Sequence, residues 1–339
     1  MDFKKTIFLK LSLLLFLTSC SQNEASRFEF ALGTFCTITL FEQGQASIYN
    51  NIFTRLNEIE NLMSVNILSS DISRVNAAAG IEHIQVHEET FKVIERAVFF
   101  ARLSGGAFDP SVGPLVSLWN IGKDNQQVPS RNEIEKILPL INWRNIELDK
   151  NSNSVYLKVK GMALDLGAIA KGYAADESVK IIKRSNTPRA IIDLGGNIVV
   201  LGEKKDKSLW KVGIQNPEKD RGETIGYVQI PEKTVVTSGV YERFFEENGN
   251  RYHHIFNPSN GYPAHNGLLS VTLITDVSMD ADALSTAVFV LGYNEGIKLL
   301  NFFPGTEAVF IFEDKSIITT QGIDFFLTDN SFSVKQNIF

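Results

Sequence analysis

The chain has 339 residues, of which 44% are hydrophobic, and its 33 basic and 39 acidic side chains give a net charge of −6. This length accommodates one large domain or two of average size, and the composition excludes a disordered or fibrous chain. The mild negative charge offers no basic surface, so we expect no nucleic-acid partner.

The first twenty residues have the layout of a bacterial export signal. Lysines precede a short apolar run, Leu11–Leu17, that is too short to cross a bilayer. The segment 17–20, Leu-Thr-Ser-Cys, resembles a lipobox, whose cysteine is lipidated after cleavage; the alternative is an ordinary signal with a coincidental cysteine. We expect a lipoprotein-type signal peptide at 1–19, a lipidation site at Cys20, a tether at 20–27 and one domain at 28–339. The protein would then be an exported lipoprotein on the periplasmic side of the inner membrane.

The cysteine count fits this interpretation. The chain has two cysteines, and lipidation of Cys20 would leave Cys36 without a disulfide partner. A core, rather than a disulfide, must then stabilise the exported domain.

The rest of the chain mixes strand and helix patterns. Alternating apolar residues predict a strand at 35–41, and apolar residues at helical spacing predict helices at 48–63 and 88–103. Further strands are expected at 189–194, 210–215, 224–230, 251–256 and 269–275, followed by a helix at 280–291, another short helix and two or three strands. The order lacks regular βαβ alternation, which favours an α+β fold of mixed sheets and packed helices around an active-site cleft.

Several common sites are missing from the sequence. It contains no Walker loop, no dinucleotide-binding glycine motif, no His-Glu-x-x-His and no Cys-x-x-Cys. Walker-type ATPases, Rossmann dehydrogenases and zincin proteases are therefore excluded.

Two glycine-rich segments remain as candidate ligand sites. Loop 104–114 would let backbone approach a ligand, with Asp109 as its single charge; a helix C-cap followed by an Asp-Pro turn is the alternative. In 165–173 a strand gives way to a helix, where glycines leave room for a phosphate and Lys171 adds positive charge. A simple junction with Asp165 as helix N-cap is the alternative there.

A third candidate is a pair of oxygen-bearing side chains in the helix at 280–291. Asp282 and Thr286 lie four residues apart, so both face the same side one turn from each other. A carboxylate and a hydroxyl are hard oxygen ligands that suit Mg²⁺. The alternative is that Asp280 or Asp282 caps the helix while Thr286 packs.

The histidine pair His253-His254 precedes a cluster of turn residues. Because neighbouring strand residues point to opposite faces, one imidazole must face the core or a cleft. Such a histidine suits a general base, and a structural histidine with satisfied hydrogen bonds is the alternative.

Taken together, the order and spacing of eight segments resemble the ApbE family of flavin transferases over nearly the whole mature chain. The segments are 32–34, 63–76, 104–110, 165–173, 193–197, 237–239, 252–255 and 282–287. The resemblance implies an ApbE-like fold and an FAD:protein FMN transferase. Such an enzyme uses Mg²⁺ to move FMN from FAD onto a Ser or Thr hydroxyl of a target protein, with release of AMP.

The resemblance also implies residue roles. The backbone carbonyl of Ala168 and the side chains of Asp282 and Thr286 would bind Mg²⁺, and His254 would be the general base. FAD would be contacted by Leu32, Asn66, Ala107, Phe108, Asp109, Asp165, Lys171 and Ile255. The acceptor protein would be a flavin-carrying subunit of a membrane redox pump.

The sequence departs from the family pattern at three positions. Leu32 stands where Met is common, Asn66 where Tyr is frequent, and Asn257 where Asp is frequent. Two other functions stay open: an FAD pyrophosphatase that hands FMN to water, and a lipoprotein that stores FAD without chemistry.

Overall fold

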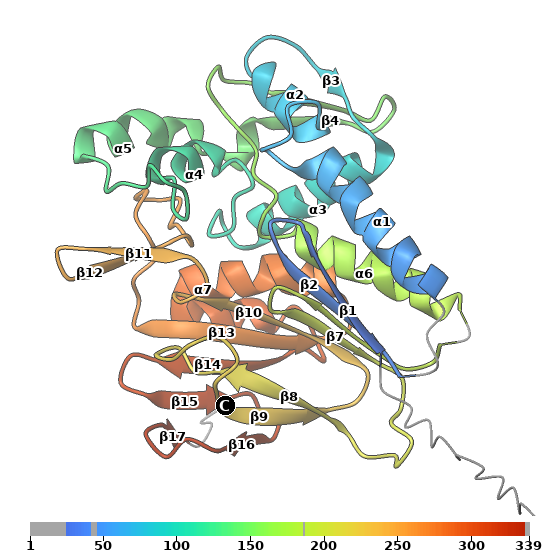
Figure 1. The fold of residues 1–339 in the computed structure, drawn as a ribbon. Coiled ribbons are helices and arrows are strands. Elements are labelled where there is room, and N and C mark those ends of the chain that lie inside the picture. Colours follow the sequence, from blue (N-terminus) through green and yellow to red (C-terminus); the bar gives the residue numbers. More distant parts are fainter. Residues whose placement is uncertain (1–24, 42–45, 186, 336–339) are drawn as a thin grey trace, which may run out of the picture.

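The computed structural model describes residues 25–41, 46–185 and 187–335 (Figure 1). The predicted signal peptide, Cys20 and tether residues 20–24 lie outside this part. Strand β1 (Ala25–Ala31) contains the last three residues of the predicted tether, so the tether was predicted too long.

A nine-stranded sheet forms the centre of the molecule. Its strand order is β1, β2 (Thr34–Leu40), β6 (Ala190–Leu194), β7 (Asn197–Leu201), β10 (Lys233–Gly239), β13 (Leu268–Thr275), β14 (Glu307–Phe312), β15 (Ser316–Thr319) and β17 (Ser333–Val334). Neighbouring strands are antiparallel except β15 and β17. This mixture of sheets and helices confirms the predicted α+β fold.

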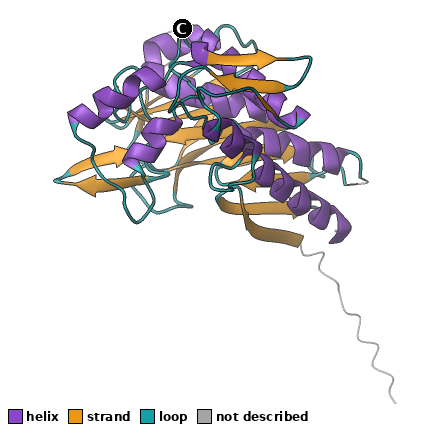
Figure 2. Cartoon of the chain, turned by 90° about the horizontal axis from the view of Figure 1, so that it is seen from above, coloured by secondary structure: helices purple, strands orange, loops and turns teal. Residues whose placement is uncertain are grey.

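Helices cover one face of this sheet and a small sheet covers part of the other (Figures 1 and 2). The larger core joins the sheet to the helices α1 (Ala46–Met63), α6 (Ala170–Lys183) and α7 (Ser278–Leu300). A second core packs the sheet against the three strands β8 (Trp210–Gln215), β9 (Thr224–Ile230) and β16 (Phe325–Leu327).

A smaller region lies beyond the helical layer in Figure 1. It contains α2 (Asp71–Ala77), α3 (Glu88–Leu103), α4 (Gly113–Trp119), α5 (Arg131–Ile137), two 3₁₀ turns (Leu138–Leu140, Trp143–Asn145) and the strands β3 (Ile84–Gln85), β4 (Ile146–Asp149) and β5 (Ser154–Leu157). In the hairpin of β11 (Phe244–Glu247) and β12 (Asn250–His253), Tyr252 packs against Trp119 of α4, with ring centroids 5.5 Å apart, and Phe245 belongs to the same core.

The long predicted helices follow their apolar spacing. In α3, the buried side chains Phe91, Ile94 and Ala97 recur every three residues. His87 caps this helix because its Nδ1 accepts the N–H of Glu89 at 3.3 Å.

The end of the chain differs partly from prediction. Gly292, with φ 76°, breaks α7, which confirms one helix followed by a short one. Up to residue 335, the last described, four strands follow instead of two or three. The strand predicted at 251–256 ends at His253, because the chain then enters a turn in which the Asn257 N–H donates to the Tyr262 carbonyl.

Cys36 of β2 is fully buried, and burial raises the pKa of its thiol to about 12. Among the described helices, none has the length and apolar character needed to cross a membrane.

Candidate active site

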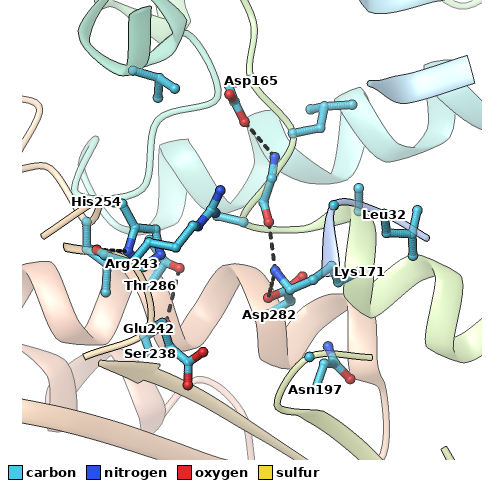
Figure 3. A pocket seen from close by; sticks show the side chains of 18 of the residues that line it. Leu32, Asp165, Lys171, Asn197, Ser238, Glu242, Arg243, His254, Asp282 and Thr286 are labelled. Carbon is cyan, nitrogen blue, oxygen red and sulfur yellow. Dashed lines mark hydrogen bonds and ion pairs between the residues drawn. The ribbon is translucent and has the colours of Figure 1, made fainter. Parts of the chain in front are cut away.

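A pocket of about 400 Å³ opens among the β1–β2 turn, the loop before α4 with the start of that helix, the start of α6 and the first half of α7 (Figure 3). Its volume lies in the range of pockets that hold small molecules or parts of cofactors. Every binding, catalytic and metal residue predicted from the sequence lines it: Leu32, Asn66, Ala107, Phe108, Asp109, Asp165, Ala168, Lys171, His254, Ile255, Asp282 and Thr286. Residues scattered along the chain therefore converge on one site.

The proposed metal side chains lie where α6 crosses α7. Asp282 is 5% exposed; its Oδ2 accepts the N–H of Gly172 at 2.9 Å, and its Oδ1 lies 3.8 Å from Lys171 Nζ. One turn further, Thr286 Oγ1 lies 3.3 Å from Ser238 Oγ. Both oxygens line the pocket, as their spacing predicts.

The capping alternative for this helix is wrong. The N-cap of α7 is Val277, which makes no side-chain cap. Asp280 instead pairs with Arg96, whose Nε donates to Oδ1 at 2.8 Å. Asp282 is therefore held inside the helix, facing the pocket.

Asp282 also satisfies a backbone donor at the start of α6. The helix begins at Ala170 with Ile169 as N-cap, whose carbonyl accepts the N–H of Tyr173. Gly172 lies in the first turn, where backbone N–H groups have no partner within the helix, and its N–H donates to Asp282. Ala168 precedes the N-cap and lines the pocket, and its carbonyl accepts no backbone hydrogen bond among the described residues.

These three oxygens fit Mg²⁺ by their chemistry. Carboxylate, hydroxyl and carbonyl are hard oxygen ligands, and Mg²⁺ keeps several positions for water and substrate phosphates. No group of three or more His, Cys, Asp or Glu suited to a metal occurs among the described residues. The predicted metal ligands include only one residue of these types, Asp282, so this observation does not bear on them.

His254 is held with one nitrogen available. Its Nδ1–H donates to the Arg243 carbonyl at 3.1 Å, and its backbone N–H donates to the same oxygen at 3.1 Å. The ring is half-buried, and its desolvation, together with the positive charge of Arg243, holds its pKa well below the usual value. The imidazole is therefore neutral near pH 7 with Nε2 as its acceptor, which is the state a general base requires.

His253 follows the structural alternative. It is buried, its Nε2–H donates to the Ala264 carbonyl at 2.9 Å, and its Nδ1 accepts the N–H of Ile255 at 3.3 Å. Burial lowers its pKa to about 4. Its two nitrogens are thus both used inside the protein.

The 104–114 loop has features of both predicted structures, the ligand-contacting loop and the Asp-Pro turn. Ala107 and Phe108 line the pocket, whereas the Asp109 carboxylate holds the turn together. Its Oδ1 accepts the N–H and hydroxyl of Ser111 at 2.8 and 2.7 Å, and its Oδ2 accepts the Trp143 N–H at 3.0 Å. Burial raises the pKa of Asp109. Its carboxylate thus shapes the pocket wall through the loop.

The 165–173 segment does not use Asp165 as a helix cap, so that alternative is wrong. The N-cap of α6 is Ile169, and Asp165 Oδ1 accepts the N–H of Gly167 at 2.7 Å. Lys171 Nζ donates to the Gly167 carbonyl at 3.0 Å. The segment folds into a tight turn that presents Lys171 to the pocket.

The three departures from the family pattern have visible local roles. Leu32 adopts a positive φ of 55°, and its N–H donates to Glu60 at 2.9 Å. Asn66 is exposed at the pocket rim, 3.5 Å from Lys123 Nζ. Asn257 Oδ1 accepts the N–H and hydroxyl of Ser259, so its amide builds the turn after β12.

Sequence reasoning gave no role to several pocket residues. Asn197 is 1% exposed; its Oδ1 accepts the Ser278 hydroxyl at 2.6 Å, and its Nδ2 has no partner among the described residues. A buried donor without a partner is costly, which indicates a ligand acceptor there. The signal was present in the glycine pair 195–196, whose positive φ angles turn the chain into the pocket. Ser238, Glu242, Arg243 and Arg221 were also missed.

Comparison with known proteins agrees with the geometry. A sequence model of the ApbE family matches residues 32–310. The FAD:protein FMN transferase of Treponema pallidum is 40% identical over 318 residues, covering 89% of this chain and 88% of the relative. That of Klebsiella pneumoniae is 36% identical over 305 residues, covering 89% and 94%. The crystal structure of an ApbE protein from Thermotoga maritima superposes with a TM-score of 0.78 at 35% identity, covering 91% of this chain and 97% of that one.

Proposed function

The chain belongs to the ApbE family and is a flavin transferase that acts on FAD and a protein acceptor, and we propose that it uses Mg²⁺ to move FMN onto a Ser or Thr hydroxyl with release of AMP. The observation that carries the proposal is one pocket lined by both a hard-oxygen trio and a neutral, oriented histidine. Storage of FAD alone would need no such base.

The oxygen trio has a defined place in this chemistry. Asp282, Thr286 and the Ala168 carbonyl would hold Mg²⁺. When bound, the ion supplies positive charge that offsets repulsion between the pyrophosphate and the nucleophile and stabilises charge in the transition state. Lys171, 3.8 Å from Asp282, adds a second cation beside the same oxygens.

His254 acts as the general base for the attacking hydroxyl. Its Nε2 takes the hydroxyl proton as the oxygen forms a bond to the phosphorus that carries riboflavin, and the bond from that phosphorus to the AMP oxygen breaks. The Arg243 carbonyl keeps the other nitrogen protonated throughout. No covalent bond to the enzyme is needed.

The test incubates the full chain with FAD, Mg²⁺ and a candidate acceptor protein. We expect a covalent FMN adduct on the acceptor by mass spectrometry, together with free AMP. Free FMN and AMP without adduct would support the pyrophosphatase instead, and unchanged bound FAD would support storage.

The metal assignment is tested with Asp282→Ala and Asp282→Asn. Both should lower Mg²⁺-dependent transfer by about 10²-fold or more, because a metal ligand stabilises the transition state by several kcal/mol. The Asn variant keeps an oxygen for the Gly172 N–H and should stay folded. Asp280→Asn, on the same helix but paired with Arg96, is the matched control. Wild-type turnover in Asp282→Asn would exclude this metal site.

The membrane location rests on the sequence. We propose that Cys20 is lipidated after removal of residues 1–19, which holds the enzyme on the periplasmic side of the inner membrane near an acceptor subunit of a redox pump. The lysines, the apolar run and the lipobox pattern support this. Mass spectrometry of the N-terminal peptide should find an acylated Cys20; an unmodified Cys20 would contradict it.

A further inference from the structure

Three phenylalanines stand exposed on one face of the β1–β2 hairpin. Phe28, Phe30 and Phe35 are 72%, 65% and 65% exposed. The antiparallel register places Phe30 opposite Phe35, with ring centroids 5.5 Å apart, and Phe28 opposite Thr37. The three rings therefore form one continuous surface, the hairpin aromatic face.

The opposite face of the hairpin is buried. Cys36 and Ile38 of β2 point into the helical core. Arg27 of β1 lies over the Phe53 ring of α1, with its guanidinium 5.4 Å from the ring centroid. The hairpin thus has one face packed on α1 and the aromatic face directed away from it.

On the side of the aromatic face, the small sheet of β8, β9 and β16 covers the neighbouring strands but not the hairpin. The register pairs Thr39 with Ile191 of β6, which places Ile191 on the same side as Phe35. Ile191 packs against the core under β8, β9 and β16, and that core includes no residue of β1 or β2. Strand β1 is also the end strand of the described sheet.

Contiguous exposed aromatic rings mark a surface that meets a partner or a membrane. The other side chains on this side of the hairpin, Ser26, Thr37 and Thr39, are uncharged. A face with aromatic rings and hydroxyls but no charge suits the boundary between lipid headgroups and acyl chains.

The proposed anchor favours lipid over a protein partner. Four residues lie between Cys20 and Ala25, where β1 begins, so five Cα–Cα steps join the two. A fully extended chain of that length spans at most about 18 Å. A lipid on Cys20 therefore keeps the hairpin close to the bilayer surface, at a high effective concentration of lipid.

We propose that the hairpin aromatic face docks into the interfacial layer of the membrane that holds the lipid anchor. The proposal rests on the lipidation of Cys20. The turn that joins the two strands, Leu32-Gly33, lines the pocket together with Thr34 of β2. Docking would therefore hold the pocket at a fixed orientation to the bilayer, where a membrane-bound acceptor presents its hydroxyl.

The experiment places a tryptophan on this face in the full lipidated chain, reconstituted in vesicles of phosphatidylethanolamine and phosphatidylglycerol. Phe28→Trp is compared with Phe302→Trp, a matched control because Phe302 is 69% exposed and lies between α7 and β14, a strand that four others separate from β2 in the sheet. Vesicles with brominated acyl chains should quench about half of the emission that Phe28→Trp adds. The emission that Phe302→Trp adds should stay unchanged.

Each other outcome overturns the docking. Equal or absent quenching of the two tryptophans, with Cys20 acylated, shows that the face does not enter the lipid. A Phe28→Trp emission that responds to protein concentration and not to bromine assigns the face to a second copy of the chain. An unmodified Cys20 removes both anchor and docking. FMN transfer to a soluble acceptor, measured in parallel, would persist in all three cases and separates them from failure of the enzymatic function.

Discussion

Two adjacent histidines take different roles because of single hydrogen bonds. His253 uses both ring nitrogens inside the protein, whereas His254 uses only Nδ1, toward the Arg243 carbonyl. A carbonyl accepts only, so it fixes the proton on Nδ1 and leaves the lone pair on Nε2. The positioning of the proposed base therefore rests on a backbone group.

This arrangement predicts the pH dependence of transfer. A base works when neutral, and the pKa of His254 is held below the usual 6.5, so the rate should be flat at neutral pH and fall only below that value. His254→Ala should keep FAD binding and slow transfer by about 10²–10⁴-fold. Single-turnover rates of adduct formation between pH 5 and 8 provide the measurement. A midpoint above 6.5 that disappears in His254→Ala would refute the lowered pKa, and an unchanged rate in that variant would remove the base.

For single residues, the sequence predicts which side chains line the pocket better than it predicts the groups with which they form hydrogen bonds. The spacing of Asp282 and Thr286 places both on one helical face, as found. Ser278, which lies 81 residues away, donates to Oδ1 of Asn197 and so orients the amide whose Nδ2 has no partner among the described residues. The acceptor of His254, in turn, is a main-chain oxygen that has no sequence signature. Such contacts form only when separate elements meet.

The crossing of α6 and α7 is the element on which the site depends. A Cβ on Gly172 would collide with the Ser278 carbonyl oxygen at the start of α7. Glycine therefore lets the helices approach until Asp282 reaches the Gly172 N–H. Asp176 of α6 completes the junction by accepting the N–H groups of Ser278 and Met279, each at 2.9 Å.

Gly172→Ala should separate the two helices. We expect a loss of about 1–3 kcal/mol in the free energy of unfolding, as for other overpacked sites, and weaker Mg²⁺ dependence because Asp282 moves. Thermal melting and transfer assays with graded Mg²⁺ measure the two effects. Lys180→Ala, on the exposed side of the same helix, should change neither. Wild-type stability in Gly172→Ala would show that the junction relaxes freely.

Long periodic elements were predictable and short ones were not. The helix at 88–103 matches its prediction because many buried apolar side chains define its period. Helices α4 and α5 have seven residues each, which is too short for a clear period, and their packing depends on the distant Phe245 and Phe256. The strand expected at 251–256 was too long because a turn pairs Asn257 with Tyr262.

Folding of the whole molecule is coupled to pH through two buried groups of opposite effect. Burial lowers the pKa of His253 to about 4, so its contribution to stability is complete above about pH 6.5 and is lost as the pH falls toward 4. Burial raises the pKa of Asp176 from 3.8 to about 6, so its contribution is complete below pH 3.8 and is lost as the pH rises through 6. Acidification therefore removes the stabilising contribution of His253 while it restores that of Asp176.

The variant His253→Gln should isolate the pH-dependent contribution of His253 to stability. An amide can still donate to the Ala264 carbonyl but does not titrate. The difference in unfolding free energy between wild type and variant should shrink by up to about 3 kcal/mol between pH 7 and pH 4. Urea unfolding across this range provides the measurement. A difference that stays constant would show that His253 is not buried in its neutral form.

The buried thiol of β2 offers a practical consequence. Cys36 is fully buried with a pKa raised to about 12, so almost no thiolate is available to alkylating reagents at neutral pH. If Cys20 carries the proposed lipid, neither cysteine of the sequence reacts with maleimides. A cysteine introduced at an exposed position such as Leu68 would then take a fluorophore or spin label selectively, without prior mutation of the native residues.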